Sequence, residues 1–205
     1  MADKVIPDIV VGRLPIYLRA LQRMLAENRH VTSSQELGER LGISAAQIRK
    51  DLSQFGEFGK QGTGYSIDYL AEQIRQILKV DRVWDIAVVG AGDIGSAVAR
   101  YQGFANRGLQ VAMIFDNAPG KIGIQVRRFT VQDIADLESE IKQAGIRVAM
   151  IATPSEKAQE VADQLISAGV LAILNYAPIN LSVPENVHVQ YIDPVIHLQR
   201  MTHYL

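Results

Sequence analysis

The stretch Val88-Val89-Gly90-Ala91-Gly92-Asp93-Ile94-Gly95 decides the fold of most of this 205-residue chain. It begins as a short apolar run with the composition of a buried parallel strand, and a helical pattern follows it. Its glycines have the spacing G-x-G-x-x-G at a strand-to-helix turn, which is the context of a dinucleotide-binding motif. Gly90 permits the tight turn, Gly92 lets a pyrophosphate approach the backbone, and Gly95 lets the helix pack against the strand. We therefore predict that residues 90–95 bind a pyrophosphate at the helix N-terminus.

An acidic residue follows this motif at the distance that dinucleotide binding requires. A second apolar run, 111–115, ends in Asp116, about 20 residues after the last glycine, where an acid would bind the adenosine ribose 2′-hydroxyl. The same carboxylate would repel a 2′-phosphate. No arginine follows directly to reverse that preference, and Lys121 is the nearest cation in the next segment. Asp116 therefore predicts NADH and NAD⁺ as ligands rather than their 2′-phosphorylated forms.

From residue 85 onward, the pattern alternates between strands and helices, which predicts an α/β domain with a doubly wound parallel sheet. The expected strands are 85–89, 111–115, 147–152, 170–174 and 187–191. The expected helices lie near 94–106, 131–143 and 156–168, with Ser155 as a cap and Gly169 at the end of the last one. Loops after such strands line the ligand crevice. On the nicotinamide side, these loops would contribute Thr153, Pro154, Asn175, Tyr176, Ala177 and Pro178.

Residues 1–80 form a different pattern, which is helical with one glycine-rich loop. A first helix should span 14–28, with Pro15 either in its first turn or at a kink. Ser33 and Ser44 each have the spacing of a helix cap, which predicts short helices at 35–41 and 45–55. Two capped helices joined by the tight turn 42–44 have the form of a helix-turn-helix.

The helix expected at 45–55 has an apolar stripe, Ile48, Leu52 and Phe55, and a basic outer face that would fit a DNA major groove. Four glycines within 56–65 suggest a β-hairpin wing that touches the DNA backbone, and an amphipathic helix follows. The sequence therefore predicts a winged helix-turn-helix domain. Its expected DNA-binding residues are Ser33, Ser44, Ala46, Gln47, Arg49, Lys50, Ser53 and Lys60.

These patterns divide the chain into three parts: a DNA-binding domain at 1–80, a dinucleotide-binding domain of Rossmann type at 81–192, and a C-terminal helix at 193–205. The terminal helix carries Val195, Leu198 and Met201 along one side. It has no expected partner in its own sheet. Terminal apolar helices of this kind often pack against another subunit, so we expect a homodimer.

Composition excludes several other classes of protein. The chain has no cysteine, so it has no disulfide, thiolate nucleophile or cysteine-bound metal, and we expect no metal site. It has no apolar run long enough to span a membrane and no signal core, so a cytoplasmic location is expected. None of the four histidines has a partner at catalytic spacing, which argues against a small NAD-dependent dehydrogenase. A repressor that senses another adenine nucleotide stays possible from these residues alone.

The chain resembles the Rex family of redox-sensing transcriptional repressors over nearly its whole length. The resemblance depends on the blocks 13–19, 32–37, 48–59, 62–65, 89–95, 101–104 and 174–178. It implies a homodimer that binds a palindromic operator when NADH is scarce and leaves the DNA when NADH binds. It also implies that the C-terminal helix is exchanged between subunits. By matching positions, Arg13, Tyr101 and Asp193 would form the network that senses the state of the nicotinamide.

Overall fold

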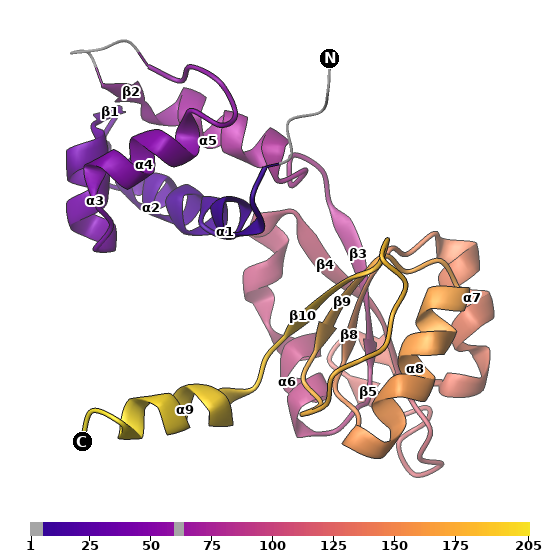
Figure 1. The fold of residues 1–205 in the computed structure, drawn as a ribbon. Helices are drawn as coiled ribbons and strands as arrows, with labels where there is room; N and C mark the ends of the chain where they lie inside the picture. The colour runs from indigo at the N-terminus through magenta and orange to yellow at the C-terminus, as the bar shows by residue number, and fades with distance from the viewer. Residues whose placement is uncertain (1–5, 60–63) are drawn as a thin grey trace. The chain divides into compact units, whose positions relative to one another are not determined.

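The computed structural model describes residues 6–59 and 64–205 of the chain (Figure 1). Its contacts divide the chain into two compact units, Met1–Arg82 and Val83–Leu205. Each unit has its own hydrophobic core. The first unit is helical and the second contains a six-stranded sheet, so we describe them separately.

The first unit is a bundle of helices with a two-stranded ribbon at one end. Its helices are α1 (Asp8–Val11), α2 (Leu14–Ala26), α3 (Ser34–Leu41), α4 (Ala45–Leu52) and α5 (Ile67–Ile77). Strands β1 (Val31–Thr32) and β2 (Tyr65–Ser66) pair in antiparallel fashion. The apolar faces of α2, α3, α4 and α5 enclose a core that includes Leu14, Tyr17, Leu21, Met24, Leu37, Ile48, Leu52, Leu70 and Ile74. Helices α3 and α4 with the turn between them form the expected helix-turn-helix.

Serine side chains begin the two helices of this motif, as the sequence predicted. The Ser33 hydroxyl accepts a hydrogen bond from the Glu36 N–H at 3.1 Å, and the Ser44 hydroxyl accepts one from the Gln47 N–H at 3.2 Å. Gly42 ends α3 in the left-handed region with φ of 67°, a conformation that glycine adopts without strain. Local sequence therefore determines both ends of the turn.

The cap of α4 makes a measurable contribution to stability. We expect Ser44→Ala to destabilise the first turn of α4 by about 1 kcal/mol, because one helix N–H then loses its acceptor. Ser155→Ala is the matched control, since Ser155 lies at the start of a helix but accepts no capping hydrogen bond. Hydrogen exchange of the two first turns should show faster exchange for Ser44→Ala alone. Equal effects of the two substitutions would contradict this role for the cap.

The end of α4 differs from the expectation, and the structure decides between the two alternatives for Pro15. Helix α4 ends at Leu52 instead of continuing to residue 55, because the side chains of Ser53 and Gln54 donate to the Lys50 carbonyl and compete with the next helical bonds. Pro15 lies in the first turn of α2 and causes no kink. Strand β2 pairs with β1, ahead of α3, and part of the expected wing (residues 60–63) lies outside the described residues. The expected wing residue Lys60 lies outside the described residues.

The second unit is built on a parallel sheet with the strand order β10-β9-β8-β3-β4-β7. The strands are β3 (Trp84–Val89), β4 (Leu109–Asp116), β7 (Gln132–Asp133), β8 (Val148–Ile151), β9 (Ala172–Asn175) and β10 (His188–Tyr191). This order is that of the doubly wound dinucleotide-binding fold. The chain progresses in opposite directions from the central pair β3 and β8, so a ligand crevice is expected at their carboxyl ends.

Alternate residues of the strands supply the cores on the two faces of this sheet. Ala87 and Val89 pack with residues of α7 (Leu137–Ala144) and α8 (Ser155–Ser167). Ile86 and Val88 point to the opposite face, where they pack with Ala99 of α6 (Asp93–Arg100). Figure 1 shows α7 and α8 on one side of the sheet and α6 on the other. The predicted doubly wound α/β fold is therefore confirmed.

Helix boundaries in this unit differ from the sequence prediction. Helix α6 ends at Arg100, because Tyr101 takes an extended conformation with ψ of 120°, and the 3₁₀ helix Gln102–Arg107 follows. Helix α7 begins only at Leu137. The segment before it forms the hairpin of β5 (Gln125–Val126) and β6 (Phe129–Thr130), then β7 and the 3₁₀ turn Ile134–Asp136. Pro154, and not Ser155, occupies the N-cap of α8.

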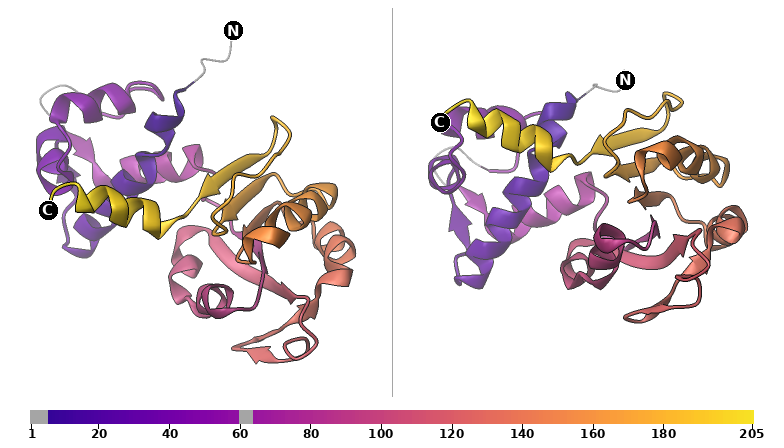
Figure 2. Two further views of the ribbon diagram at one scale, coloured as in Figure 1. Left: turned by 60° about the horizontal axis from the view of Figure 1, so that its bottom comes forward. Right: turned by 90° about the horizontal axis from the view of Figure 1, so that it is seen from below.

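The chain ends in α9 (Pro194–Thr202), which extends away from the sheet beyond β10 (Figure 2). None of its residues is buried. Its exposed apolar side chains are Val195, Ile196, Leu198 and Met201.

Candidate functional site

The outer face of α4 presents a basic surface. Arg49 and Lys50 are exposed there, while Ile48 and Leu52 on the opposite stripe are buried in the core of the unit. Within residues 6–59 and 64–205, neither basic side chain has a carboxylate within ion-pair distance. The other predicted DNA-binding residues in this part of the chain are also exposed or half-exposed, namely Ser33, Ser44, Ala46, Gln47 and Ser53.

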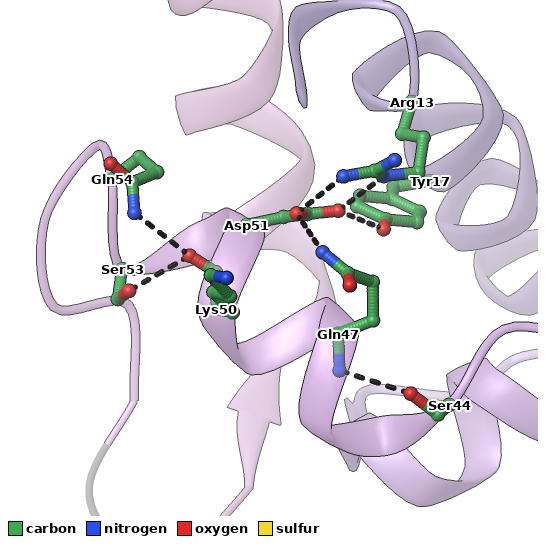
Figure 3. A network of polar contacts seen from close by, with 8 residues as sticks. All are labelled: Arg13, Tyr17, Ser44, Gln47, Lys50, Asp51, Ser53 and Gln54. Carbon is green, nitrogen blue, oxygen red and sulfur yellow. Dashed lines mark hydrogen bonds and ion pairs between the residues drawn. The ribbon is translucent and has the colours of Figure 1, made fainter. Parts of the chain in front are cut away.

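A fully buried carboxylate anchors this helix to α2 (Figure 3). Asp51 accepts hydrogen bonds from Arg13 Nε at 2.6 Å and Arg13 Nη2 at 2.7 Å. The Tyr17 hydroxyl donates to Oδ2 at 2.6 Å, and Gln47 Nε2 donates to Oδ1 at 2.7 Å. An ionised carboxylate has about four acceptor sites, so all of them are filled. Asp51 therefore fixes both α4 and the amide of Gln47.

The surroundings of Asp51 keep it ionised. Burial pushes its pKa upward, but the hydrogen bonds from Arg13, Tyr17 and Gln47 outweigh burial and leave the pKa below its usual value. Burial, together with donation to Asp51, raises the pKa of Tyr17, so its hydroxyl stays a donor. The sequence interpretation did not select Asp51. The sequence did contain a sign of its role, because Asp51 lies next to Leu52 on the helix face that was expected to point into the core.

The glycine-rich turn between β3 and α6 has the geometry that the motif predicts. Gly90 has φ of 101°, and a Cβ there would collide with the Ala152 carbonyl. A Cβ on Gly95 would collide with the Gly90 carbonyl, so this glycine allows helix and strand to approach closely. At Gly92 a Cβ would meet nothing within 4 Å. Gly92 is also the N-cap of α6 and supplies no side-chain acceptor, so the first turn offers its N–H groups to a ligand.

Asp116 ends β4 beside this turn and is only 5% exposed. Its Oδ2 accepts from the Ala91 N–H at 2.7 Å and from Lys121 Nζ at 3.0 Å, and its Oδ1 accepts from the Ala118 N–H at 2.8 Å. Burial pushes the pKa upward, but these donors outweigh it and lower the pKa. Three of about four acceptor sites are thus filled by described residues, which leaves one on Oδ1 for a hydroxyl.

A cavity of about 640 Å³ lies in front of the turn. Seven of the predicted ligand residues line it: Gly90, Gly92, Asp93, Ile94, Asp116, Thr153 and Pro154. Two more polar atoms in its wall, Thr153 Oγ1 and Gln164 Oε1, are buried and have no hydrogen-bond partner among the described residues. Buried polar atoms are rarely left unpaired, so these two are exceptions in the wall of the cavity. The turn and the acid together fit an adenine dinucleotide.

The other predicted ligand residues occupy different places. Ala91 and Gly95 support the turn through their backbone and close packing. Residues 175–178 do not line this cavity, and the Asn175 amide is used within its own loop, where it bonds to Ala177 and Ile179. Thr153 and Pro154 line the same cavity as Asp116, and their place on the nicotinamide side stays a prediction.

Helix α8 contributes a set of cavity residues that the sequence interpretation missed. They lie on one face, at spacings of three or four, and are Lys157, Glu160, Val161 and Gln164. Their helical spacing was visible in the sequence. The sequence did not show which side of the sheet the helix covers, because that depends on the placement of β8 beside β3.

The three residues of the expected sensing network have separate partners in this single chain. Arg13 is paired with Asp51, and the Tyr101 ring packs edge-on against Phe104 with centroids 5.1 Å apart. Asp193 caps α9 by accepting from the Val195 N–H at 2.9 Å. The network implied by the resemblance would involve a second subunit, so it stays a prediction.

In residues 6–59 and 64–205, no helix has the length and apolar character needed to cross a bilayer. Within these ranges there is also no group of three or more histidine or acidic side chains that could hold a metal ion.

Family models and curated relatives match both units. Residues 5–53 match the model of a putative DNA-binding protein N-terminus, and residues 81–179 match that of a CoA binding domain. The redox-sensing transcriptional repressor Rex of Roseiflexus sp. is 53% identical over 199 residues, which are 97% of this chain and 90% of the relative. Rex 1 of Thermotoga maritima is 45% identical over 203 residues, which are 98% of this chain and 96% of the relative.

Solved structures agree with this relationship. The structure of RSP in complex with β-NAD⁺ and operator DNA matches with a TM-score of 0.93 and 35% identity, and covers 98% of this chain and 93% of that one. RSP in complex with β-NADH matches with a TM-score of 0.89 and 32% identity, and the match covers 98% of this chain and 95% of that one. A helix-turn-helix unit joined to a dinucleotide-binding unit defines a class of ligand-responsive transcription regulators. Within that class, the chain belongs to the Rex family of redox-sensing transcriptional repressors, which confirms the resemblance.

Proposed function

We propose that this protein is a transcriptional repressor that binds palindromic operator DNA and is released from it by NADH. One observation supports this most directly. A single chain contains a basic helix-turn-helix face on α4 and, in its second unit, a glycine-turn cavity with a ribose-binding acid at Asp116. The solved complexes of a Rex-family relative with NADH, and with NAD⁺ and operator DNA, support the same pair of ligands.

In this proposal NADH is an effector and the protein is not an enzyme. If NADH and operator favour different arrangements of the protein, linkage makes their effects reciprocal: each weakens the binding of the other by the same factor. NAD⁺ differs by a positive charge on one ring, so discrimination requires a site that desolvates this ring.

The proposed repressor is a cytoplasmic homodimer with a DNA-binding domain at 1–80, a nucleotide domain at 81–192 and an exchanged helix at 193–205. The exposed apolar side chains of α9 support the dimer, because a helix that buries none of its own residues gains little from its own chain. Exchange of this helix would bring Asp193 to the partner subunit. Arg13, Tyr101 and Asp193 are the residues that we propose for coupling the nucleotide to the DNA.

Fluorescence anisotropy of a labelled duplex, selected from a random library by the purified protein, tests this function. Salt is held constant because phosphate contacts make affinity salt-dependent. NADH should release the duplex at concentrations where NAD⁺ has little effect. Coenzyme A and ADP serve as competitors that test for another adenine nucleotide as effector. Tight binding to DNA that no nucleotide changes would contradict redox sensing.

Arg49 provides a separate test of the DNA-binding face. We expect Arg49→Ala to weaken duplex binding by about 10- to 100-fold, because a contact to a base or phosphate at this position is worth about 1–3 kcal/mol. NADH affinity should stay unchanged. Arg75→Ala, which removes a cation of the same unit from α5, is the control. An equal loss for both variants would show that net charge, and not the face of α4, determines binding.

A further inference from the structure

The cavity is lined by Lys121, a cation that is not part of the glycine-rich nucleotide motif. Lys121 Nζ lies 3.0 Å from Asp116 Oδ2, the same oxygen that accepts the Ala91 N–H. The Lys121 side chain is 44% exposed and the Asp116 side chain is 6% exposed, so the ammonium group covers the solvent side of the carboxylate. The residue that would bind the ribose is therefore one half of an ion pair.

The remaining charges of the cavity wall do not replace Lys121. Lys157 is paired with Glu160 at 2.9 Å on α8, and Asp93 adds a negative charge at the start of α6. Lys121 is thus the cation beside the ribose-binding acid, and its position is determined by that acid. A phosphate on the ribose 2′-oxygen would be placed next to this pair.

We propose that Lys121 is a specificity-determining residue that is masked by Asp116. With Asp116 ionised, its Oδ1 accepts a ribose hydroxyl, its charge repels a 2′-phosphate, and the ammonium of Lys121 is engaged. When position 116 is neutral, the repulsion disappears and Lys121 loses its anionic partner. The same ammonium then pairs with a 2′-phosphate, for which a charge-assisted contact is favourable. This inference depends on the proposed nucleotide site and adds the choice between NADH and NADPH.

A double-mutant cycle on the full-length protein tests the proposal. Calorimetry gives the dissociation constants of NADH and NADPH for the unchanged protein, Asp116→Asn, Lys121→Met and the double variant. The unchanged protein should bind NADH much more tightly than NADPH. Asp116→Asn should lower the ratio of the NADPH constant to the NADH constant by about 10- to 100-fold, mainly through tighter binding of NADPH. The double variant should lose this gain.

The controls separate this proposal from the underlying function. Competition by 2′,5′-ADP against 5′-ADP measures the contribution of the 2′-phosphate without the nicotinamide, and it should change as NADPH does. The role proposed for Lys121 is wrong if the double variant binds NADPH as tightly as Asp116→Asn does. It is also wrong if Asp116→Asn gains no NADPH affinity while its melting temperature is unchanged. Asp116→Ser replaces Asp116→Asn if the latter does not fold. If the unchanged protein binds neither nucleotide, the proposed function itself fails.

Discussion

Gly92→Val should abolish the response to NADH while leaving the fold and DNA binding intact. Gly92 has φ of −78° and ψ of −165°, an extended conformation that valine also adopts, and a Cβ there meets nothing within 4 Å. The added side chain would instead occupy the space in front of the first turn of α6, where we place the pyrophosphate. Losing charge-assisted hydrogen bonds to that turn should weaken NADH binding by about 100-fold or more.

Calorimetry with NADH and anisotropy with the selected duplex measure the two parts of this prediction. Gly120→Val is the matched control, because a Cβ on Gly120 also meets nothing within 4 Å, but Gly120 does not line the cavity. It should keep NADH-dependent release. A Gly92→Val protein that is released normally by NADH would show that the dinucleotide binds elsewhere.

Asp51→Asn should destabilise the DNA-binding unit more than Ser44→Ala or Asp68→Asn does. Asparagine would place an NH₂ group among three side chains that already donate to position 51, and it would leave the Arg13 guanidinium without its anion. Breaking a buried pair by removing one partner costs about 3–5 kcal/mol, and we expect about 3 kcal/mol because the Arg13 side chain is 20% exposed. Hydrogen exchange of α2 and α4 in the full-length protein measures this loss.

The control for this substitution is Asp68→Asn in the same unit. The Asp68 side chain is 69% exposed and lies 3.9 Å from His30, so its removal should change stability by less than about 0.5 kcal/mol. We also expect duplex binding to weaken in Asp51→Asn, since the amide of Gln47 loses its anchor. Similar exchange in the two variants would contradict the structural role of Asp51.

Asp51 also predicts the direction of a pH effect. Its pKa is lower in the folded protein than its ordinary value of 3.8, so the unfolded chain binds a proton more readily. The ionised carboxylate therefore stabilises the unit fully above the unfolded pKa, and this contribution is lost as pH falls through the lower folded pKa. Protection of α2 and α4 should therefore decrease progressively as pH falls below about 5 in the unchanged protein. Asp51→Asn should lack this part of the pH dependence.

Features determined by short segments could be predicted from the sequence. The caps at Ser33 and Ser44 depend on an N–H three residues away, and the nucleotide turn depends on three glycines within six residues. The strand positions and the acid at 116 followed from apolar runs and their spacing. For this reason the fold and the glycine turn beside Asp116 could be predicted, although the ends of α4 and α6 and the start of α7 could not.

Features that depend on contacts between distant segments could not be predicted in the same way. The partners of Asp51 on α2 lie 34 and 38 residues earlier in the chain. Gln164 enters the cavity only because β8 pairs with β3, which places α8 over this end of the sheet. Lys121 is near Asp116 in sequence, but the contact requires the loop after β4 to fold back, and spacing alone does not determine that conformation.

The filled acceptor sites of Asp51 have a mechanical consequence for regulation. Because α4 is anchored to α2, we expect the proposed DNA-reading surface to keep its shape when the unit moves. Two such units in a two-fold dimer fit successive turns of duplex DNA only at a spacing of about 34 Å or its multiples. A ligand then needs to change only the separation of the two units to end binding. In the proposed dimer, the two DNA-binding surfaces would stay unchanged, and the nucleotide would set the distance between them.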